Sequence, residues 1–156
     1  MRLHELFPDV PGDIKMIEIT GLAYDEHGLS PGTLFFCLRG PTRDGHDFAA
    51  EVIQAGAVAL VAPSFAEGFG LPVVESLAAG TPALVSDIAA HREVGGDMVL
   101  YADPVDGPSW ISAIETLMDP RAQLSPEMRA KIARYQPMTW KAHVEDAMRI
   151  IERVQR

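Results

Sequence analysis

The sequence contains a single cysteine, Cys37. One thiol excludes an intramolecular disulfide and any zinc site built from several cysteines. Cys37 lies in the apolar run 34–38, where a small buried hydrophobic side chain is expected more than a reactive thiol. We therefore assign Cys37 to the core of the protein.

Long hydrophobic runs and basic residues are also scarce. The longest apolar stretch, residues 55–62, is far shorter than the roughly 18 residues that a membrane span needs, and residues 1–5 carry no signal-peptide pattern. The 13 basic and 22 acidic residues give a formal net charge of -9, whereas nucleic-acid binding normally uses a basic surface. We expect a soluble, cytoplasmic protein with no nucleic-acid or membrane partner.

Phosphate-binding fingerprints are absent as well. No lysine follows a glycine and precedes serine or threonine, so the sequence has no Walker loop. Gly68 and Gly70 lack the third glycine of a dinucleotide-binding G-x-G-x-x-G motif. The histidines show no metal-ligand spacing, and no Ser-His-Asp constellation can be argued from the sequence. We expect neither a metal nor a cofactor.

What the sequence does contain is an alternation of strand-like and helix-like segments in 156 residues, the length of about one domain. The expected strands are residues 14–23, 34–38, 57–62, 82–85 and 98–101, and the expected helices are residues 48–56, 72–79, 89–94, 109–118, 125–135 and 139–154. This order predicts a single α/β, Rossmann-like domain. It would have a mostly parallel sheet of about four or five strands, helices on both faces and a helical C-terminus.

Two local patterns refine this prediction. Asp44 and His46 precede a helix and are interpreted as helix-capping side chains rather than as catalytic groups. Ser125 followed by Pro126 is typical of a helix start. In the last expected helix, an apolar stripe is predicted to pack on the core. Its members are Val144, Ala147, Met148, Ile151 and Val154.

The segment 63–75 is the strongest candidate for a ligand site. It follows a buried strand and opens a helix, which is where α/β sheets bind ligands. Gly68 and Gly70 allow close approach of the backbone to a ligand, and the helix N-terminus favours a phosphate. Glu67 and Glu75 are candidates for sugar and ribose hydroxyls. The alternative is a tight turn with two solvated glutamates, and the spacing alone favours this alternative.

The second half of the chain resembles a known family. Residues 67–72, Glu75, and the segments 79–82, 92–97 and 103–104 resemble the nucleotide-sugar domain of retaining GT-B glycosyltransferases of the GT4 type. The resemblance implies that Glu67 lies by the donor sugar and that Glu75 binds the ribose. It also implies that the loop Gly68, Phe69, Gly70 and Leu71 meets the sugar and the phosphate.

The first half resembles a different family. Residues 19–25, 31–36, 39–40, 44–49 and 57–61 are similar to the N-terminal domain of Mur ligases, most of all the enzyme that adds the third residue to UDP-MurNAc-dipeptide. The resemblance implies that this half holds the UDP end of a substrate. The matching positions are Tyr24, Glu26 and the loop Pro41-Thr42-Arg43.

The two resemblances meet at residues 62 and 63 without a linker, whereas natural fusions normally join whole domains through flexible segments. We therefore expect one composite domain over residues 1–156, with a Mur ligase-like fragment at 1–62 and a glycosyltransferase-like fragment at 63–156. On this interpretation the chain is an engineered chimera with no catalytic residues and no catalytic activity, because both parent-like active sites are incomplete.

Two other functions stay open at this point. The chain would bind UDP or a UDP-sugar weakly at the glycosyltransferase-like half-site, or it would be a truncated but active glycosyltransferase. Self-association through an exposed sheet edge is a further expectation, since an unpaired edge strand is a template for pairing.

Overall fold

The computed structural model describes residues 19–25, 28–40, 44–118 and 124–154. Its centre is a five-stranded sheet in the order β1-β2-β3-β4-β5, in which every neighbouring pair is parallel. The strands are β1 (Gly21–Ala23), β2 (Thr33–Phe36), β3 (Ala59–Ala62), β4 (Ala83–Ser86) and β5 (Leu100–Ala102). The α/β class and the parallel sheet predicted from the sequence are confirmed.

The central strands form the middle of the core. Every residue of β3 and β4 is buried, which is typical of a parallel strand covered on both faces. The register is continuous across the sheet, with Leu34 paired to Ala59 and Leu60 paired to Ala83. Because all five strands run the same way, their carboxyl ends lie along one edge.

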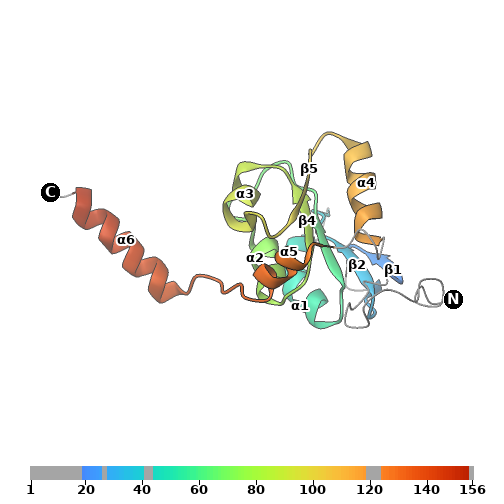
Figure 1. Ribbon diagram of the computed structural model, residues 1–156, viewed down its shortest axis with the longest axis horizontal. Coiled ribbons are helices and arrows are strands. Elements are labelled where there is room, and N and C mark those ends of the chain that lie inside the picture. The colour runs from blue at the N-terminus through green and yellow to red at the C-terminus, as the bar shows by residue number, and fades with distance from the viewer. Residues whose placement is uncertain (1–18, 26–27, 41–43, 119–123, 155–156) are drawn as a thin grey trace.

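Helices cover both faces of the sheet, as the sequence predicted (Figure 1). The helical segments are η3 (Gly45–Phe48), α1 (Ala49–Gln54), α2 (Leu71–Ala78), α3 (Ala89–Gly95), α4 (Gly107–Met118), α5 (Pro126–Ile132) and α6 (Trp140–Val154). Phe35 and Leu60 face one side, where they share a core cluster with residues of α1, α2 and α5. Leu34 and Leu84 face the other side with Leu117 of α4.

Several local predictions are confirmed. Gly56 follows α1 with φ +100°, a left-handed conformation that glycine adopts without steric cost. The Ser125 side chain accepts a hydrogen bond from the Met128 amide at 3.1 Å, and Pro126 opens α5. Cys37 is 1% exposed, and burial raises the pKa of its thiol far above the ordinary range.

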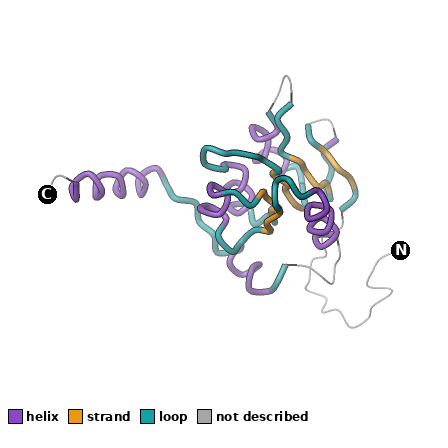
Figure 2. The backbone as a smooth tube through the Cα atoms, turned by 90° about the horizontal axis from the view of Figure 1, so that it is seen from above, coloured by secondary structure: helices purple, strands orange, loops and turns teal. Residues whose placement is uncertain are grey.

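The prediction for the last helix is partly wrong. α6 does form, but none of its residues is buried, and Met148 and Val154 are 51% and 82% exposed. In both views α6 extends away from the body formed by the sheet and the other helices (Figures 1 and 2). Amphipathic periodicity shows that a helix has an apolar stripe, but it does not specify the surface that covers the stripe.

Two further expectations concern the surface. No helix among the described residues is long and apolar enough to cross a membrane. The edges of the sheet are β1 and β5, each three residues long. Self-association through either edge stays a prediction.

Candidate functional site

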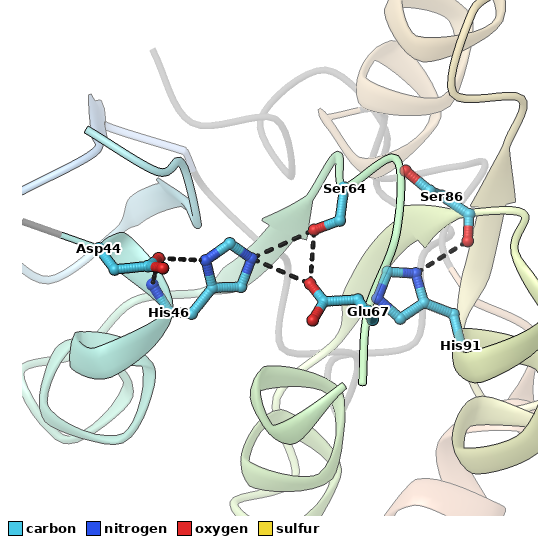
Figure 3. A network of polar contacts seen from close by, with 6 residues as sticks. All are labelled: Asp44, His46, Ser64, Glu67, Ser86 and His91. Carbon is cyan, nitrogen blue, oxygen red and sulfur yellow. Dashed lines mark hydrogen bonds and ion pairs between the residues drawn. The ribbon is translucent and has the colours of Figure 1, made fainter. Parts of the chain in front are cut away.

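The candidate site lies at the carboxyl edge of the sheet. The segments that follow β2, β3 and β4 all begin there, because parallel strands end on the same side. They carry Asp44 and His46 after β2, Ser64 and Glu67 after β3, and His91 after β4 (Figure 3). Residues from both halves of the sequence therefore meet at one edge.

Asp44 is the N-cap of η3. Its Oδ1 atom accepts a hydrogen bond from the His46 amide at 3.1 Å, which confirms the capping role predicted for Asp44. The same oxygen contacts Nδ1 of the His46 ring. Hydrogen bonds from the His46 side chain and backbone, followed by the charge of His46 and of Arg39, lower the pKa of Asp44.

The capping role predicted for His46 is wrong, because its ring spans two segments instead. Nε2 lies 3.1 Å from Ser64 Oγ and 3.1 Å from Glu67 Oε1, and the Ser64 hydroxyl donates to the same Glu67 oxygen at 2.6 Å. Asp44, His46, Ser64 and Glu67 thus form a continuous polar network from η3 to the β3–α2 loop (Figure 3). The side chains of His46 and Glu67 are only 21% and 17% exposed.

The loop after Glu67 is open to solvent. Gly68 is exposed, no atom lies within 4 Å of a Cβ built on it, and Phe69 and Leu71 are 56% and 59% exposed. Gly70 is buried with φ +83°, immediately before α2. Close approach of a ligand to this loop stays a prediction.

Beneath the loop lies a buried histidine. His91 is 0% exposed, its Nδ1 donates to the Ser86 carbonyl at 2.9 Å, and a Cβ built on Gly70 would lie 3.1 Å from its Cδ2 atom. Within the described part of the chain, neither His91 Nε2 nor Ser86 Oγ has a hydrogen-bond partner. The ring packs against Gly70, so a side chain at this position would be in tight contact with it.

Glu75 lies in a different environment from Glu67. It is half-buried on α2, and burial raises the pKa of its carboxyl, while a hydrogen bond from the Ala50 amide opposes this change. Ala50 belongs to α1, so the Glu75 side chain lies between α1 and α2. Its charge, with those of Asp44 and Glu67, adds to the raised pKa of Cys37. The three carboxylates therefore all act on the same buried thiol.

The positions taken from the Mur ligase resemblance are less central. Tyr24 follows β1, two strands away from β3, and is 65% exposed. The other matching positions, Glu26, Pro41, Thr42 and Arg43, lie outside the described residues. Among the described residues, no three His, Cys, Asp or Glu side chains are grouped so as to hold a metal ion.

The sequence analysis did not predict that Ser64 belongs to the network, nor that His46 bridges two segments. A signal was present, because Ser64 follows β3 closely and His46 comes after the neighbouring strand β2. Carboxyl ends of adjacent parallel strands meet at one edge, so polar residues after each of them are candidates for contact.

The arrangement of the elements is similar to that of a solved glycosyltransferase structure. Sucrose-phosphate synthase from Thermosynechococcus elongatus matches with a TM-score of 0.55 and 18% identity, over 94% of this chain and 47% of that chain. At this identity the likeness shows the fold alone, a GT-B Rossmann-like fold.

The sequence comparison then gives the family. Residues 44–137, more than half of the chain, match the family described as glycosyl transferases group 1. The chain belongs to this family. The match begins at Asp44 and includes the whole polar network.

Individual relatives match shorter stretches. The O-antigen chain mannosyltransferase RfbU of Salmonella typhimurium is 45% identical over 67 residues, 43% of this chain and 19% of that protein. The UDP-N-acetylmuramoyl-L-alanyl-D-glutamate–2,6-diaminopimelate ligase of Listeria monocytogenes is 42% identical over 66 residues, 40% of this chain and 13% of that protein. The chain thus covers less than a fifth of the length of these relatives.

These findings correct the main functional prediction. The expectation of an engineered protein that is not an enzyme is wrong, because the chain belongs to a family of glycosyltransferases. Similarity to both a glycosyltransferase and a Mur ligase is confirmed. The matched range 44–137 crosses the expected boundary between residues 62 and 63, which stays a prediction.

Proposed function

We propose that this chain forms the nucleotide-sugar binding part of a group 1 glycosyltransferase. The observation that carries the proposal is the β3–α2 loop, which presents Glu67 and two glycines at the carboxyl edge of the sheet, at the start of α2. The family match includes this loop. A loop of this kind suits a sugar linked to a diphosphate, because hydroxyl groups donate to carboxylates and phosphates favour helix N-termini.

The proposed roles within the site are those that the family resemblance implies. Glu67 accepts hydrogen bonds from hydroxyl groups of the donor sugar. Gly68 and Gly70 allow the sugar and the diphosphate to approach the backbone, and Phe69 and Leu71 supply exposed apolar contact area beside them. Glu75 binds the ribose once the nucleotide lies against α2.

The donor is proposed to be a UDP-sugar, and the whole enzyme is proposed to transfer the sugar to an acceptor held by another part of the protein. Covering 47% of the sucrose-phosphate synthase chain is consistent with one half of a two-part enzyme.

A titration tests the binding proposal. The chain is titrated with UDP, UDP-glucose, GDP and GDP-mannose while its amide NMR spectrum is recorded. We expect saturable shifts of Gly68, Gly70 and Glu75, with the uridine compounds binding more tightly. Glu75→Gln should weaken binding about tenfold, the loss of a hydrogen bond to a charged group. Glu152→Gln, at an exposed position of α6, should leave it unchanged.

Two outcomes count against the proposal. If none of the four compounds shifts the loop, the chain is not a nucleotide-sugar binder. If Glu75→Gln and Glu152→Gln have the same affinity as the native chain, the ribose role of Glu75 is wrong. Release of UDP from UDP-glucose above the level of Glu67→Ala would extend the proposal from binding to chemistry.

We also propose that the domain is composite, with a Mur ligase-like stretch at residues 1–62 and a glycosyltransferase-like stretch at 63–156. The match to the Listeria ligase over 66 residues supports a Mur ligase-like stretch of about this length. The continuous register from β2 to β4 explains how two stretches share one sheet. Tyr24, Thr42 and Arg43 would then form a second contact with a uridine nucleotide. Shifts of the Tyr24 amide on addition of UDP would support this contact.

A further inference from the structure

The two carboxylate oxygens of Glu67 are in different situations. Oε1 accepts from the Ser64 hydroxyl at 2.6 Å and lies 3.1 Å from His46 Nε2. No hydrogen bond from the described residues reaches Oε2, and in Figure 3 the dashed lines end on one oxygen of the pair. One oxygen is held, and the other has no hydrogen bond from the described residues.

The direction of the hydrogen bonds in the network shows which atoms of His46 donate. Ser64 has one hydroxyl hydrogen, and it is directed at Glu67, so Ser64 cannot also donate to the histidine ring. His46 Nε2 is therefore the donor toward Ser64 and Glu67. When both ring nitrogens carry a hydrogen, Nδ1 donates to the carboxylate of Asp44 while Nε2 donates toward Glu67, since an ionised carboxylate only accepts.

The backbone holds His46 at this position. The Gly45 amide donates to the Leu38 carbonyl at 2.9 Å, and Asp44 caps the 3-10 helix that carries the ring. A freely rotating glutamate loses side-chain entropy when it becomes fixed, a cost of up to about 2 kcal/mol. In this chain, the segment after β2 has already fixed Glu67 before any ligand binds.

We propose that His46 is a positioning residue for Glu67 at the donor-sugar site, an inference that rests on the proposed function. The ring holds Oε1, with Asp44 behind it, and turns Oε2 toward a hydroxyl group of the hexose. The residues that position Glu67 thus come from the segment after β2, outside the β3–α2 loop.

Affinity measurements on three variants test this inference. The measured quantity is the gain in affinity of a sugar nucleotide over its free diphosphate, for UDP-glucose against UDP and for GDP-mannose against GDP. His46→Leu should reduce this gain about tenfold, the loss of one charge-assisted hydrogen bond, and leave binding of the free diphosphate unchanged. His46→Gln places an amide donor near the same position and should restore part of the gain. The matched control, His143→Leu on the exposed face of α6, should change neither quantity.

A spectroscopic measurement tests the contact without any ligand. In the free chain, Glu67→Gln should shift the imidazole ¹⁵N signal of His46 Nε2 and leave the ring signals of His143 in place. Amide spectra of all variants show whether they are folded.

The outcomes separate the inference from the function on which it rests. If the native chain binds none of the four compounds, the proposed function is overturned and the positioning role with it. If the native chain binds but His46→Leu keeps the full sugar-dependent gain, or loses affinity for UDP and UDP-glucose equally, the positioning role alone is overturned. An unshifted His46 signal in Glu67→Gln also overturns it.

Discussion

Glu67 and Glu75 lie eight positions apart in one motif, yet their surroundings are opposite. Glu67 is held by a hydroxyl and an imidazole from the loop and from a neighbouring segment. Glu75 is half-buried between two helices, where burial raises its pKa and a single backbone amide opposes the change. One carboxylate is held by polar side chains, and the other is partly desolvated.

The difference teaches that the spacing of a motif does not set the electrostatics of its members. Glu67 lies beyond the end of β3, within reach of the segment that follows β2. Glu75 lies on the face of α2 that packs against α1. Partners from neighbouring elements decide how each charge is solvated.

The strongest way to break the Glu67 environment is Gly45→Ala. A Cβ at this buried position would lie 2.8 Å from Leu38 N and 2.9 Å from Leu38 O, which are backbone atoms that cannot move aside. We expect a loss of about 2–3 kcal/mol in the free energy of unfolding, measured by urea denaturation. The His46 contact with Glu67 should be lost as well.

Gly107→Ala is the matched control for that variant. No atom lies within 4 Å of a Cβ at Gly107, which begins α4. Its stability should stay the same or rise slightly. Equal stability of the two alanine variants would contradict the close packing of η3 against the segment after β2.

Gly70→Ala should have the next largest effect, because Gly70 lies between the two glutamates. Its φ of +83° is unfavourable for alanine, and the new Cβ would lie 3.1 Å from His91 Cδ2. We expect a loss of about 1–2 kcal/mol, the cost of a left-handed conformation for an ordinary residue, and weaker binding of UDP-glucose. Thermal melts and titrations measure the two effects.

Gly68→Ala serves as the comparison for Gly70→Ala. The open space around Gly68 allows a methyl group without a structural cost, so the melting temperature should not change. Reduced affinity for UDP-glucose with normal stability would show that the ligand approaches the backbone here. A large drop in melting temperature would show instead that the loop is tightly packed.

The variant Asp44→Asn tests the ionic part of the Glu67 environment, because its effect on stability should depend on pH. The pKa of Asp44 is lowered in the folded chain, so the ionised group contributes stability above the ordinary value of 3.8. This contribution is lost as the pH falls through the lower folded value. Asp44→Asn should therefore be less stable than the native chain at neutral pH and melt at a lower temperature. The loss in the free energy of unfolding should be less than about 1 kcal/mol, because solvent screens the charge. The difference should vanish in acid, and a constant difference at every pH would refute the ionic contribution.

Glu75→Gln should have the smallest effect and the opposite sign. Its raised pKa means that the protonated form favours the fold, a contribution present below the ordinary value of 4.5 and lost as the pH rises through the folded value. At neutral pH the variant should be more stable by a few tenths of a kcal/mol, a small gain because the group is partly solvated. Melting curves at neutral and acid pH measure this gain in stability. Lower stability of the variant at neutral pH would be evidence against desolvation of Glu75. A more stable variant with weaker UDP binding would indicate that Glu75 is kept for function.

Much of the fold could be predicted from local patterns. The caps at Asp44 and Ser125 and the helix-ending Gly56 depend on interactions within a few residues, and all three are confirmed. The stripe of α6 could not be assigned a partner, because its burial depends on a distant surface. For the same reason the sequence predicted a local capping role for His46 and not its contacts with Ser64 and Glu67.

The sequence by itself determined the alternation of strands and helices, the parallel sheet and the position of the β3–α2 loop, since periodicity and turn residues act over short distances. Only the tertiary structure decided that His46 meets Ser64 and Glu67, and that Glu75 faces α1. Contacts of this kind join segments that lie far apart in the chain, and they arise from the side-by-side pairing of strands and the packing of helices on the sheet.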